Sequence, residues 1–401
     1  MPISRPLFFV LLSIWLFPFA SVKMLVFGWP LYPIEAALLA GLPFFPFRRL
    51  RILWSQPLVK SIVLFAGLLF AGVLLSYVAH PSLAGLGQVK SFFLFPMVFC
   101  LFVATTLQGE DIPRVLKHWR HMLLFAATGA ILFGLGDGFT YDHRLRAWFD
   151  SPNLLALFLL PGAVLWWSEA VTSPRQRIGT WVAWLIVMVA LFLTRSYSAV
   201  SAALIAMAAF VWIMRGYVPF APLFGRKLLL IPLMLLLVFM SIEGGTDKWT
   251  MLADLHERSS LESRLMIWRA ATQMIIDQPL FGIGPGRFQE MYLAYQTYYP
   301  PYLEWAVPHP HNLWLAFWLS SGLLGVAALT WLFSAVMLFA RPYAVGTKKS
   351  LFLAILVSFF VAGFLDVPYF RAEFCYAFWL TLALLMISFL SVSNQDQNSI
   401  R

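Results

Sequence analysis

The chain has 401 residues, of which 61% are hydrophobic and only 11% are charged, whereas a soluble domain carries about 25% charged residues. It contains 38 Phe and 17 Trp, and because a water-soluble fold cannot bury so much apolar surface, most of it has to face lipid. The formal net charge of +10 is spread over many loops, which argues against a nucleic-acid-binding protein. Long runs of Leu, Phe, Ala and Val predict an all-α membrane protein and exclude the short alternating strands of a β-barrel.

Apolar runs long enough to cross a membrane recur along the whole chain. A transmembrane helix needs about 20 apolar residues, and the sequence contains twelve runs of roughly this length. The first run resembles a signal peptide, but its cleavage pattern is poor and further apolar runs follow, so it is interpreted as an uncleaved first span. The predicted spans lie at 7–27, 30–46, 57–78, 83–107, 119–136, 152–170, 178–194, 197–214, 227–242, 312–340, 351–366 and 372–392.

The basic residues of the short loops set the predicted orientation. Lys and Arg concentrate in cytoplasmic loops, and placing the N-terminus in the cytoplasm collects most of the short-loop Lys and Arg on that side. An even number of spans then returns the C-terminus to the cytoplasm. The sequence therefore predicts transmembrane helices at 1–242, one large external loop at 243–310, further transmembrane helices at 311–392 and a polar cytoplasmic tail at 393–401.

The segment 243–310 interrupts the pattern of short loops because it is too polar to stay in the membrane. A connection of this length usually has a function. Within it, the Ser-Ser-Leu-Glu sequence at 259–262 has the form of a capping box, and Pro279 is a helix stop signal. Apolar residues recur at helical spacing between these signals, which predicts an amphipathic helix on the outer membrane surface or above a cavity. The predicted apolar stripe consists of Leu261, Leu265, Trp268, Thr272 and Ile275.

Two arginines on the external side are candidates for binding an anion. Arg195 lies in the turn between two predicted spans, ahead of a helix rich in small residues that allow close packing. Arg264 lies in the first turns of the predicted amphipathic helix, next to its apolar stripe. A guanidinium group can bind an oxyanion through two parallel hydrogen bonds, so two of them suit the two phosphates of a pyrophosphate. The alternatives are an interfacial anchor for Arg195 and a solvated surface residue for Arg264.

His311 follows Pro310 at the start of the tenth predicted span, at or beside the helix N-cap. The positive end of a helix disfavours a charged imidazole, so we expect His311 to be neutral near pH 7 and able to act as a general base. The alternative is an N-cap histidine at the membrane interface without a catalytic role. His309 suggests a metal-binding pair with His311, but no nearby Cys or carboxylate completes a site in the sequence. We therefore predict neither a metal nor another cofactor.

A Gly-x-Gly-Pro-Gly run, formed by Gly282, Gly284 and Gly286, follows Pro279. It has no preceding strand and lacks the Gly-Lys-Ser/Thr ending of a nucleotide-binding P-loop, so it is interpreted as a structural turn. No other nucleotide-binding signature is visible, and the energy for a reaction then has to come from the substrate. The accessory candidates on the external side are Arg269, Arg287, His309 and Arg371.

At these positions the sequence resembles the O-antigen ligase family of Gram-negative bacteria and the superfamily that it shares with O-antigen polymerases. The length near 400 residues, the twelve predicted spans and the large loop before the histidine extend the resemblance over the whole chain. The first matching block departs from the more usual Ser-Arg-Gly of the family, since Ser196-Tyr197 follow the arginine. The three blocks that carry the resemblance are Thr194-Arg195-Ser196, then Ser263-Arg264 through Trp268 and Pro279 to Phe288, and finally His311-Asn312 with Gly322-x-x-Gly325.

The resemblance implies an inner-membrane glycosyltransferase whose active site faces the periplasm, so that the loop at 243–310 is periplasmic. It implies metal-independent, inverting transfer of a glycan from undecaprenyl pyrophosphate to a sugar hydroxyl of the lipid A core, as in lipopolysaccharide biosynthesis. Arg195 and Arg264 would bind the pyrophosphate, and His311 would deprotonate or orient the acceptor hydroxyl. Donor and acceptor are amphiphiles, so the implied partners are these two substrates and the lipid bilayer.

Two other functions compete with an O-antigen ligase. An O-antigen or exopolysaccharide polymerase would use the same donor and the same Arg and His residues, with a second carrier-linked glycan as acceptor. A transporter of lipid-linked glycans would have broken helices in two related halves and ionisable residues near the middle of the membrane. Here the candidate residues gather at the outer side and in one unpaired loop, so the sequence favours the enzyme.

Overall fold

The computed structural model describes residues 3–26, 29–54, 56–172, 178–214, 228–246, 249–250, 260–299, 307–339 and 346–399. Most of these residues are helical. The strands among them form one antiparallel hairpin, β1 (Met24–Val26) and β2 (Trp29–Leu31). Apart from this hairpin, the prediction of an all-α chain is confirmed.

Helices long and apolar enough to cross a membrane account for half of the predicted spans. The described residues contain six helices of this kind. They are α3 (Pro57–Ala79), the continuous helix of α4 (Leu83–Gln88), η4 (Val89–Leu94) and α5 (Phe95–Thr106), then α7 (Pro152–Thr172), α9 (Tyr197–Met214), α15 (Leu313–Phe339) and α17 (Ala372–Ser399).

The other predicted spans coincide with shorter or more polar helices. The total of twelve spans therefore stays a prediction, and α17 continues to Ser399 through most of the predicted tail at 393–401. These remaining helices are α1 (Arg5–Leu16), α2 (Pro33–Gly41), α6 (Ile112–Gly134), α8 (Ile178–Leu193), α11 (Leu230–Glu243) and α16 (Thr347–Gly363).

The N-terminal region differs most from the sequence-based expectation. The described residues of the predicted spans 7–27 and 30–46 form α1, α2, short 3-10 turns and most of the β1–β2 hairpin. The nine residues of α2 rise about 14 Å, less than half of the hydrocarbon core of a membrane. Proline accounts for the difference. Pro18 and Pro30 lie within runs that are apolar in composition, and proline interrupts a helix.

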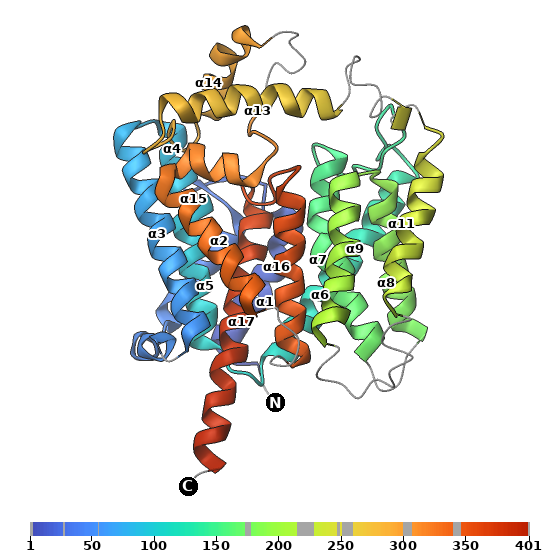
Figure 1. The fold of residues 1–401 in the computed structure, drawn as a ribbon. Coiled ribbons are helices and arrows are strands. Elements are labelled where there is room, and N and C mark those ends of the chain that lie inside the picture. The colour runs from blue at the N-terminus through green and yellow to red at the C-terminus, as the bar shows by residue number, and fades with distance from the viewer. Residues whose placement is uncertain are drawn as a thin grey trace.

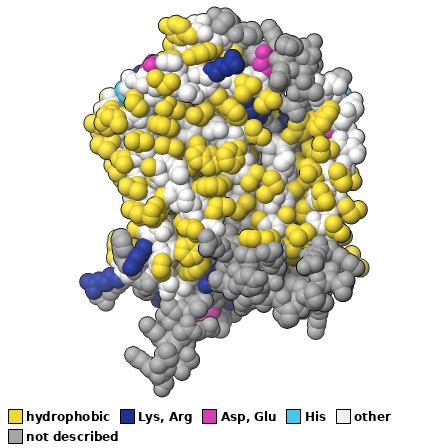
Figure 2. All heavy atoms as spheres, viewed as in Figure 1, with side chains coloured by type: hydrophobic (Ala, Val, Ile, Leu, Met, Phe, Trp, Pro, Cys, Tyr) yellow, Lys and Arg dark blue, Asp and Glu magenta, His cyan; other side chains and the backbone are white. Residues whose placement is uncertain are grey.

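The long helices pack side by side, and both chain termini lie at the same end of the bundle (Figure 1). The largest interfaces join α3 to α15 and α9 to α16. Apolar side chains such as Leu64, Leu185 and Leu237 also cover the outside of the bundle. Figure 2 shows them as a broad hydrophobic zone between two ends that carry charged side chains. An exposed apolar surface of this extent fits a protein embedded in lipid.

α13 (Ser260–Asp277) lies across the end of the bundle opposite the termini, with α14 (Phe288–Tyr295) beyond it (Figure 1). The helix ends before Pro279, as predicted, while Ser259 of the predicted capping box lies outside the described residues. Of the predicted apolar stripe, Ile275 is buried and Leu261 and Trp268 are half-buried, whereas Leu265 and Thr272 are exposed. The small residues on the other face allow close packing against α14 and α15. The buried face consists of Met266, Ile267, Ala270, Ala271, Met274 and Ile275.

A break in α15 joins this helix to the glycine run. Gly322 has a left-handed φ of 64°, and the interruption is filled by Leu323 N, which donates to the Leu280 carbonyl oxygen at 3.0 Å. At Gly282, where φ is 69°, a Cβ atom would lie 2.4 Å from the Leu319 carbonyl oxygen. Only glycine fits this approach of two backbones. The geometry agrees with the interpretation of the glycine run as a structural turn.

Candidate functional site

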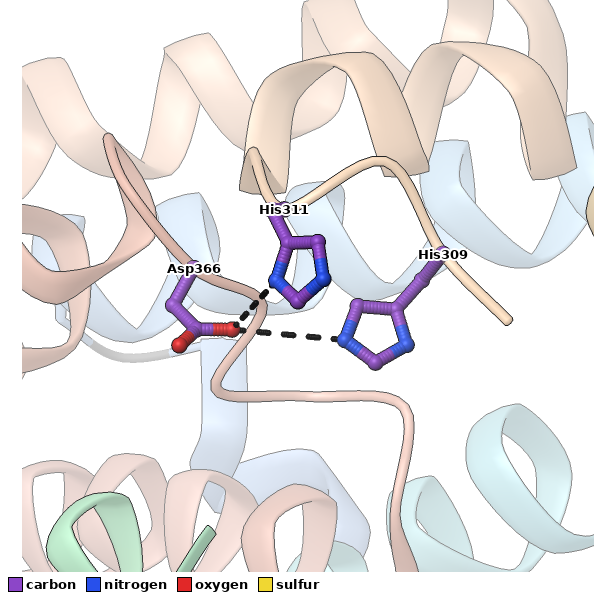
Figure 3. Close-up of side chains that lie close together, drawn as sticks. All are labelled: His309, His311 and Asp366. Atoms are coloured by element: carbon purple, nitrogen blue, oxygen red, sulfur yellow. Dashed lines mark hydrogen bonds and ion pairs between the residues drawn. The ribbon is translucent and has the colours of Figure 1, made fainter. Parts of the chain in front are cut away.

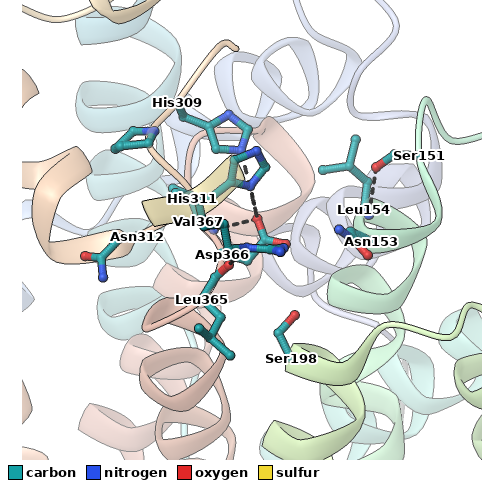
Figure 4. A network of polar contacts seen from close by, with 12 residues as sticks. Ser151, Asn153, Leu154, Ser198, His309, His311, Asn312, Leu365, Asp366 and Val367 are labelled. Atoms are coloured by element: carbon teal, nitrogen blue, oxygen red, sulfur yellow. Dashed lines mark hydrogen bonds and ion pairs between the residues drawn. The ribbon is translucent and has the colours of Figure 1, made fainter. Parts of the chain in front are cut away.

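The turn between α16 and α17 receives contacts from segments that are far apart in the sequence. Three successive residues of this turn each bind a side chain from another segment, and Figure 4 shows most of them around one region. Figure 1 places this turn at the end of the bundle opposite the termini. Asn312 Nδ2 donates to the Phe364 carbonyl oxygen at 3.1 Å, Arg264 Nε donates to the Leu365 carbonyl oxygen at 2.8 Å, and His311 Nδ1 lies 3.3 Å from Asp366 Oδ1.

His311 lies immediately before the N-cap of α15. Asn312 Oδ1 accepts a hydrogen bond from Leu315 N at 3.1 Å, which is the N-cap arrangement. His311 itself has a φ of 48°. A left-handed conformation costs a residue with a Cβ atom about 1 kcal/mol or more, and such strain concentrates at functional sites. The fold therefore holds the His311 ring in position although the His311 backbone is strained.

Asp366 is the partner of His311 and is buried, with 2% of its surface exposed. Its Oδ1 also accepts a hydrogen bond from Val367 N at 2.9 Å, whereas the buried Oδ2 has no hydrogen-bond partner among the described residues. Burial raises the pKa of Asp366, but His311, through its hydrogen bond and its charge when protonated, together with Arg264, lowers it to about 2. Asp366 is therefore ionised at neutral pH.

His309 completes a cluster with His311 and Asp366 (Figure 3). Its Nε2 lies 4.0 Å from Asp366 Oδ1, and one ligand atom from each of the three residues lies within 4.8 Å of the others. Two histidines and a carboxylate are donors that suit zinc and similar metals. The sequence-based statement that no carboxylate completes the histidine pair is therefore wrong. Asp366 lies 55 residues beyond His311 and reaches it only through the fold.

The partly buried His309 side chain, which is 20% exposed, predicts how the stability of the protein depends on pH. Burial and the neighbouring His311 lower the pKa of His309 from 6.5 to about 4, against the opposing effect of Asp366. Between these two pH values the unfolded state binds more protons than the folded state, so stability falls as the pH drops from about 6.5 to 4. Asp366 adds a further loss only as the pH falls from about 3.8 toward 2.

We expect the melting temperature of the purified protein to fall across this window, and less steeply in His309→Asn. His143→Asn is the matched control, because His143 is exposed. Equal slopes for wild type and His309→Asn between pH 6.5 and 4 would contradict the burial of a neutral His309.

A cavity of about 90 Å³ lies beside the histidines. Its volume corresponds to about three water molecules, so it can admit a small hydroxyl-bearing group. His309 both lines this cavity and lies close to Asp366. Other lining residues include Gln88, Gly284, Ser320 and Phe370.

Arg195 lies in the tight turn between α8 and α9 and, like His311, has a left-handed φ of 48°. Its Nε lies 3.4 Å from Glu243 Oε1 at the end of α11, and Glu243 is almost fully buried. Tyr197 OH donates to the other carboxylate oxygen of Glu243 at 2.9 Å. The guanidinium of Arg195 is therefore held by a carboxylate that sequence reasoning did not single out.

Arg144 lies beside the Arg195 turn and was missed in the sequence. Its Nε donates to the carbonyl oxygen of Thr194, the neighbour of Arg195, at 3.0 Å, and its pKa responds to the charge of Arg264. The only sequence signal is a concentration of charged residues in the short connection between α6 and α7, which is typical of a solvated surface loop.

The other accessory arginines have different surroundings. Arg269 is exposed on α13 and makes no hydrogen bond or ion pair with a described residue. Arg287 lies at the start of α14, where its Nη1 donates to the Ile283 carbonyl oxygen at 3.4 Å. Neither contacts the His311–Asp366 pair. Arg371 is bound by acidic and hydroxyl groups, namely Asp150 at 2.7 Å, Glu373 at 2.6 Å and Ser21 at 2.6 Å.

Residues 181–330, which run from α8 into α15, match the family model described as O-antigen ligase. This region covers more than a third of the chain and contains Arg195, Arg264, His309 and His311. For this part of the chain, the resemblance seen in the sequence is confirmed. No curated protein matches the chain significantly.

Proposed function

We propose that this chain, whose residues 181–330 form an O-antigen ligase family domain, is a membrane glycosyltransferase that transfers a glycan from undecaprenyl pyrophosphate to a sugar hydroxyl of the lipid A core. The observation that carries the proposal is the convergence on the α16–α17 turn, where Arg264 and His311 bind the successive residues Leu365 and Asp366. The proposed setting is the inner membrane, with this site on the periplasmic side and both chain termini in the cytoplasm.

His311 is the general base of the proposed reaction. Asp366 is ionised and accepts a hydrogen bond from the N–H at His311 Nδ1, which leaves Nε2 unprotonated and able to take the proton of the acceptor hydroxyl. The acceptor oxygen attacks the anomeric carbon of the donor sugar from the face opposite the pyrophosphate. The bond between that carbon and the pyrophosphate oxygen breaks with its electron pair on oxygen, and the configuration at the anomeric carbon is inverted.

Arg195 and Arg264 bind and stabilise the departing pyrophosphate. Negative charge develops on this leaving group in the transition state, and donors fixed in advance stabilise such charge more than flexible ones do. The contact of Arg195 with Glu243 and that of Arg264 with the Leu365 carbonyl oxygen hold both guanidiniums before a substrate arrives. Each of these contacts uses one part of the guanidinium, and a pyrophosphate oxygen that binds another N–H of the same group forms a charge-assisted hydrogen bond.

The test is an assay of the purified protein with a carrier-linked glycan and two acceptors offered separately. One acceptor is the lipid A core, and the other is a second carrier-linked glycan. Glycan attached to the lipid A core supports the ligase. A lengthened glycan that stays on the carrier would identify a polymerase, and no transfer to either acceptor would contradict the proposal.

Transfer is expected to persist in the presence of EDTA at more than half of the untreated rate. The hydrogen bond between His311 and Asp366 provides a base without a metal, so no step needs a Lewis acid. EDTA gives a sharp test because His309, His311 and Asp366 are positioned so that they could bind a metal ion. A metal-dependent glycosyltransferase treated in parallel shows that chelation is complete. Inhibition that Zn²⁺ or Mg²⁺ reverses would overturn the metal-free mechanism.

A further inference from the structure

Arg144 is fixed in position by the backbone of another helix. Arg144 lies on the connection between α6 and α7. Its neighbour Leu145 donates a backbone hydrogen bond from N to the Leu193 carbonyl oxygen at 2.8 Å. The Arg144 side chain is 16% exposed. Its Nε donates to the Thr194 carbonyl oxygen at 3.0 Å, and its Nη2 donates to Asn153 Oδ1 at 2.6 Å. The guanidinium is therefore anchored beside the Arg195 turn.

The remaining nitrogen of this guanidinium has no strong partner. Arg144 Nη1 makes no hydrogen bond to a described residue and lies 3.9 Å from Asp142 Oδ2, a carboxylate whose side chain is 40% exposed. Solvent weakens an ion pair of this kind. Nη1 is thus the part of Arg144 that a ligand can use.

The electrostatic surroundings of Arg144 favour a bound anion. Burial lowers the pKa of Arg144, and the positive charge of Arg264 lowers it too, whereas Asp142, Tyr197 and Glu243 raise it. Arg144 and Arg264 come from different segments, and they are close enough for the charge of Arg264 to affect the pKa of Arg144, whose side chain is mostly buried. Such like charges destabilise each other unless an anion lies near both.

A pyrophosphate has two phosphoryl groups, and one guanidinium fork matches the oxygens of only one group at a time. Arg195 and Arg264 each keep a protein partner, Glu243 and the Leu365 carbonyl oxygen. We propose that Arg144 contacts the pyrophosphate of the donor together with Arg195 and Arg264, and that it makes the site prefer diphosphate over monophosphate carriers. This inference rests on the proposed function and adds a residue that determines its donor specificity.

The test compares the binding of undecaprenyl pyrophosphate and undecaprenyl monophosphate to the full-length purified protein. In Arg144→Gln, which removes the charge but keeps an amide donor, we expect about tenfold weaker binding of the diphosphate and less than a twofold change for the monophosphate. The KM for the carrier-linked donor should rise by a similar factor. Arg146→Gln is the matched control, because Arg146 lies in the same connection and is exposed.

The ratio of the two affinities separates ligand contact from a structural role. If Arg144 only braces Thr194 and Asn153, its loss weakens both lipids in parallel, and an unchanged ratio overturns the inference. Binding indistinguishable from that of Arg146→Gln overturns it as well. If Arg144→Gln does not fold, Arg144→Lys keeps the charge without the fork and is expected to lose part of the diphosphate preference. A full preference in Arg144→Lys then contradicts the proposal.

The same experiment distinguishes this inference from the proposed function. A wild-type protein that binds the diphosphate selectively but transfers no glycan to either acceptor contradicts the proposed function alone. A wild-type protein that transfers glycan, together with an Arg144→Gln variant of unchanged preference, contradicts the role of Arg144 alone.

Discussion

Alanine in place of Arg264 is expected to lower glycan transfer at least a hundredfold while the protein still inserts and folds. A donor that stabilises transition-state charge contributes a factor of about 10²–10³ to the rate. The guanidinium of Arg264 is bound to the carbonyl oxygens of Leu365 and Ser260, and within the described part of the chain it forms no direct ion pair, although its charge lowers the pKa of Asp366. The folding cost should therefore be small. The measurement is kcat/KM for the carrier-linked donor, with the melting temperature as a check on folding.

The matched control for this variant is Arg269→Ala. Arg269 has the same charge on the same helix, but it is exposed and away from the α16–α17 turn, so we expect activity close to that of the wild type. Equal losses in the two variants would show that α13 needs positive charge in general. Wild-type activity in Arg264→Ala would remove the basis for placing a pyrophosphate at this residue.

Asparagine in place of His311 is expected to lower turnover by a factor of about 10²–10⁴, the usual contribution of a general base, while donor binding changes little. Asparagine is preferable to alanine because it tolerates the left-handed backbone found at this position. The loss then reports on the imidazole and not on the strained φ. Turnover and donor affinity have to be measured separately, on the same preparation.

His143→Asn is the control for the His311 variant. His143 also has a left-handed φ, 57°, but its side chain is exposed, so this substitution repeats the change in chemistry and backbone preference away from the site. A collapse of donor affinity in His311→Asn would identify His311 as a binding residue. The general base would then have to be sought elsewhere, with His309 as the nearest candidate.

Helix positions were predictable where apolar runs end at strong signals. The predicted spans 152–170 and 197–214 nearly coincide with α7 and α9, because proline, charged loops and the Arg195 turn mark their ends. The break at Gly322 could not be predicted, since the surrounding run is uniformly apolar and only the approach of the Leu280 backbone requires it. The buried face of α13 was misplaced because Ala270 and Ala271 are weak hydrophobic signals.

The candidate site was predictable only in those residues whose local chemistry is conspicuous. An arginine at the end of a span and a histidine at a helix start are unusual in an apolar sequence, so Arg195 and His311 were found. Their partners Glu243 and Asp366 lie 48 and 55 residues away from them in the chain. Nothing in the sequence specifies such pairings, because they arise from the packing of helices. The roles of these residues remain predictions until the variants are measured.

The hydrogen bonds between the glycine turn and α15 fix the C-terminal end of α13. Its C-terminal end is tied down where Ile283 N and Leu323 N bond across the break at Gly322, whereas Arg264 lies thirteen residues before Asp277, about 20 Å along the helix axis. Nearer to Arg264, Trp268 Nε1 donates to the Pro310 carbonyl oxygen at 2.9 Å, next to His311. Glycines without any reactive group thus help to fix the helix that carries the cationic side chain against the helix that begins beside the imidazole.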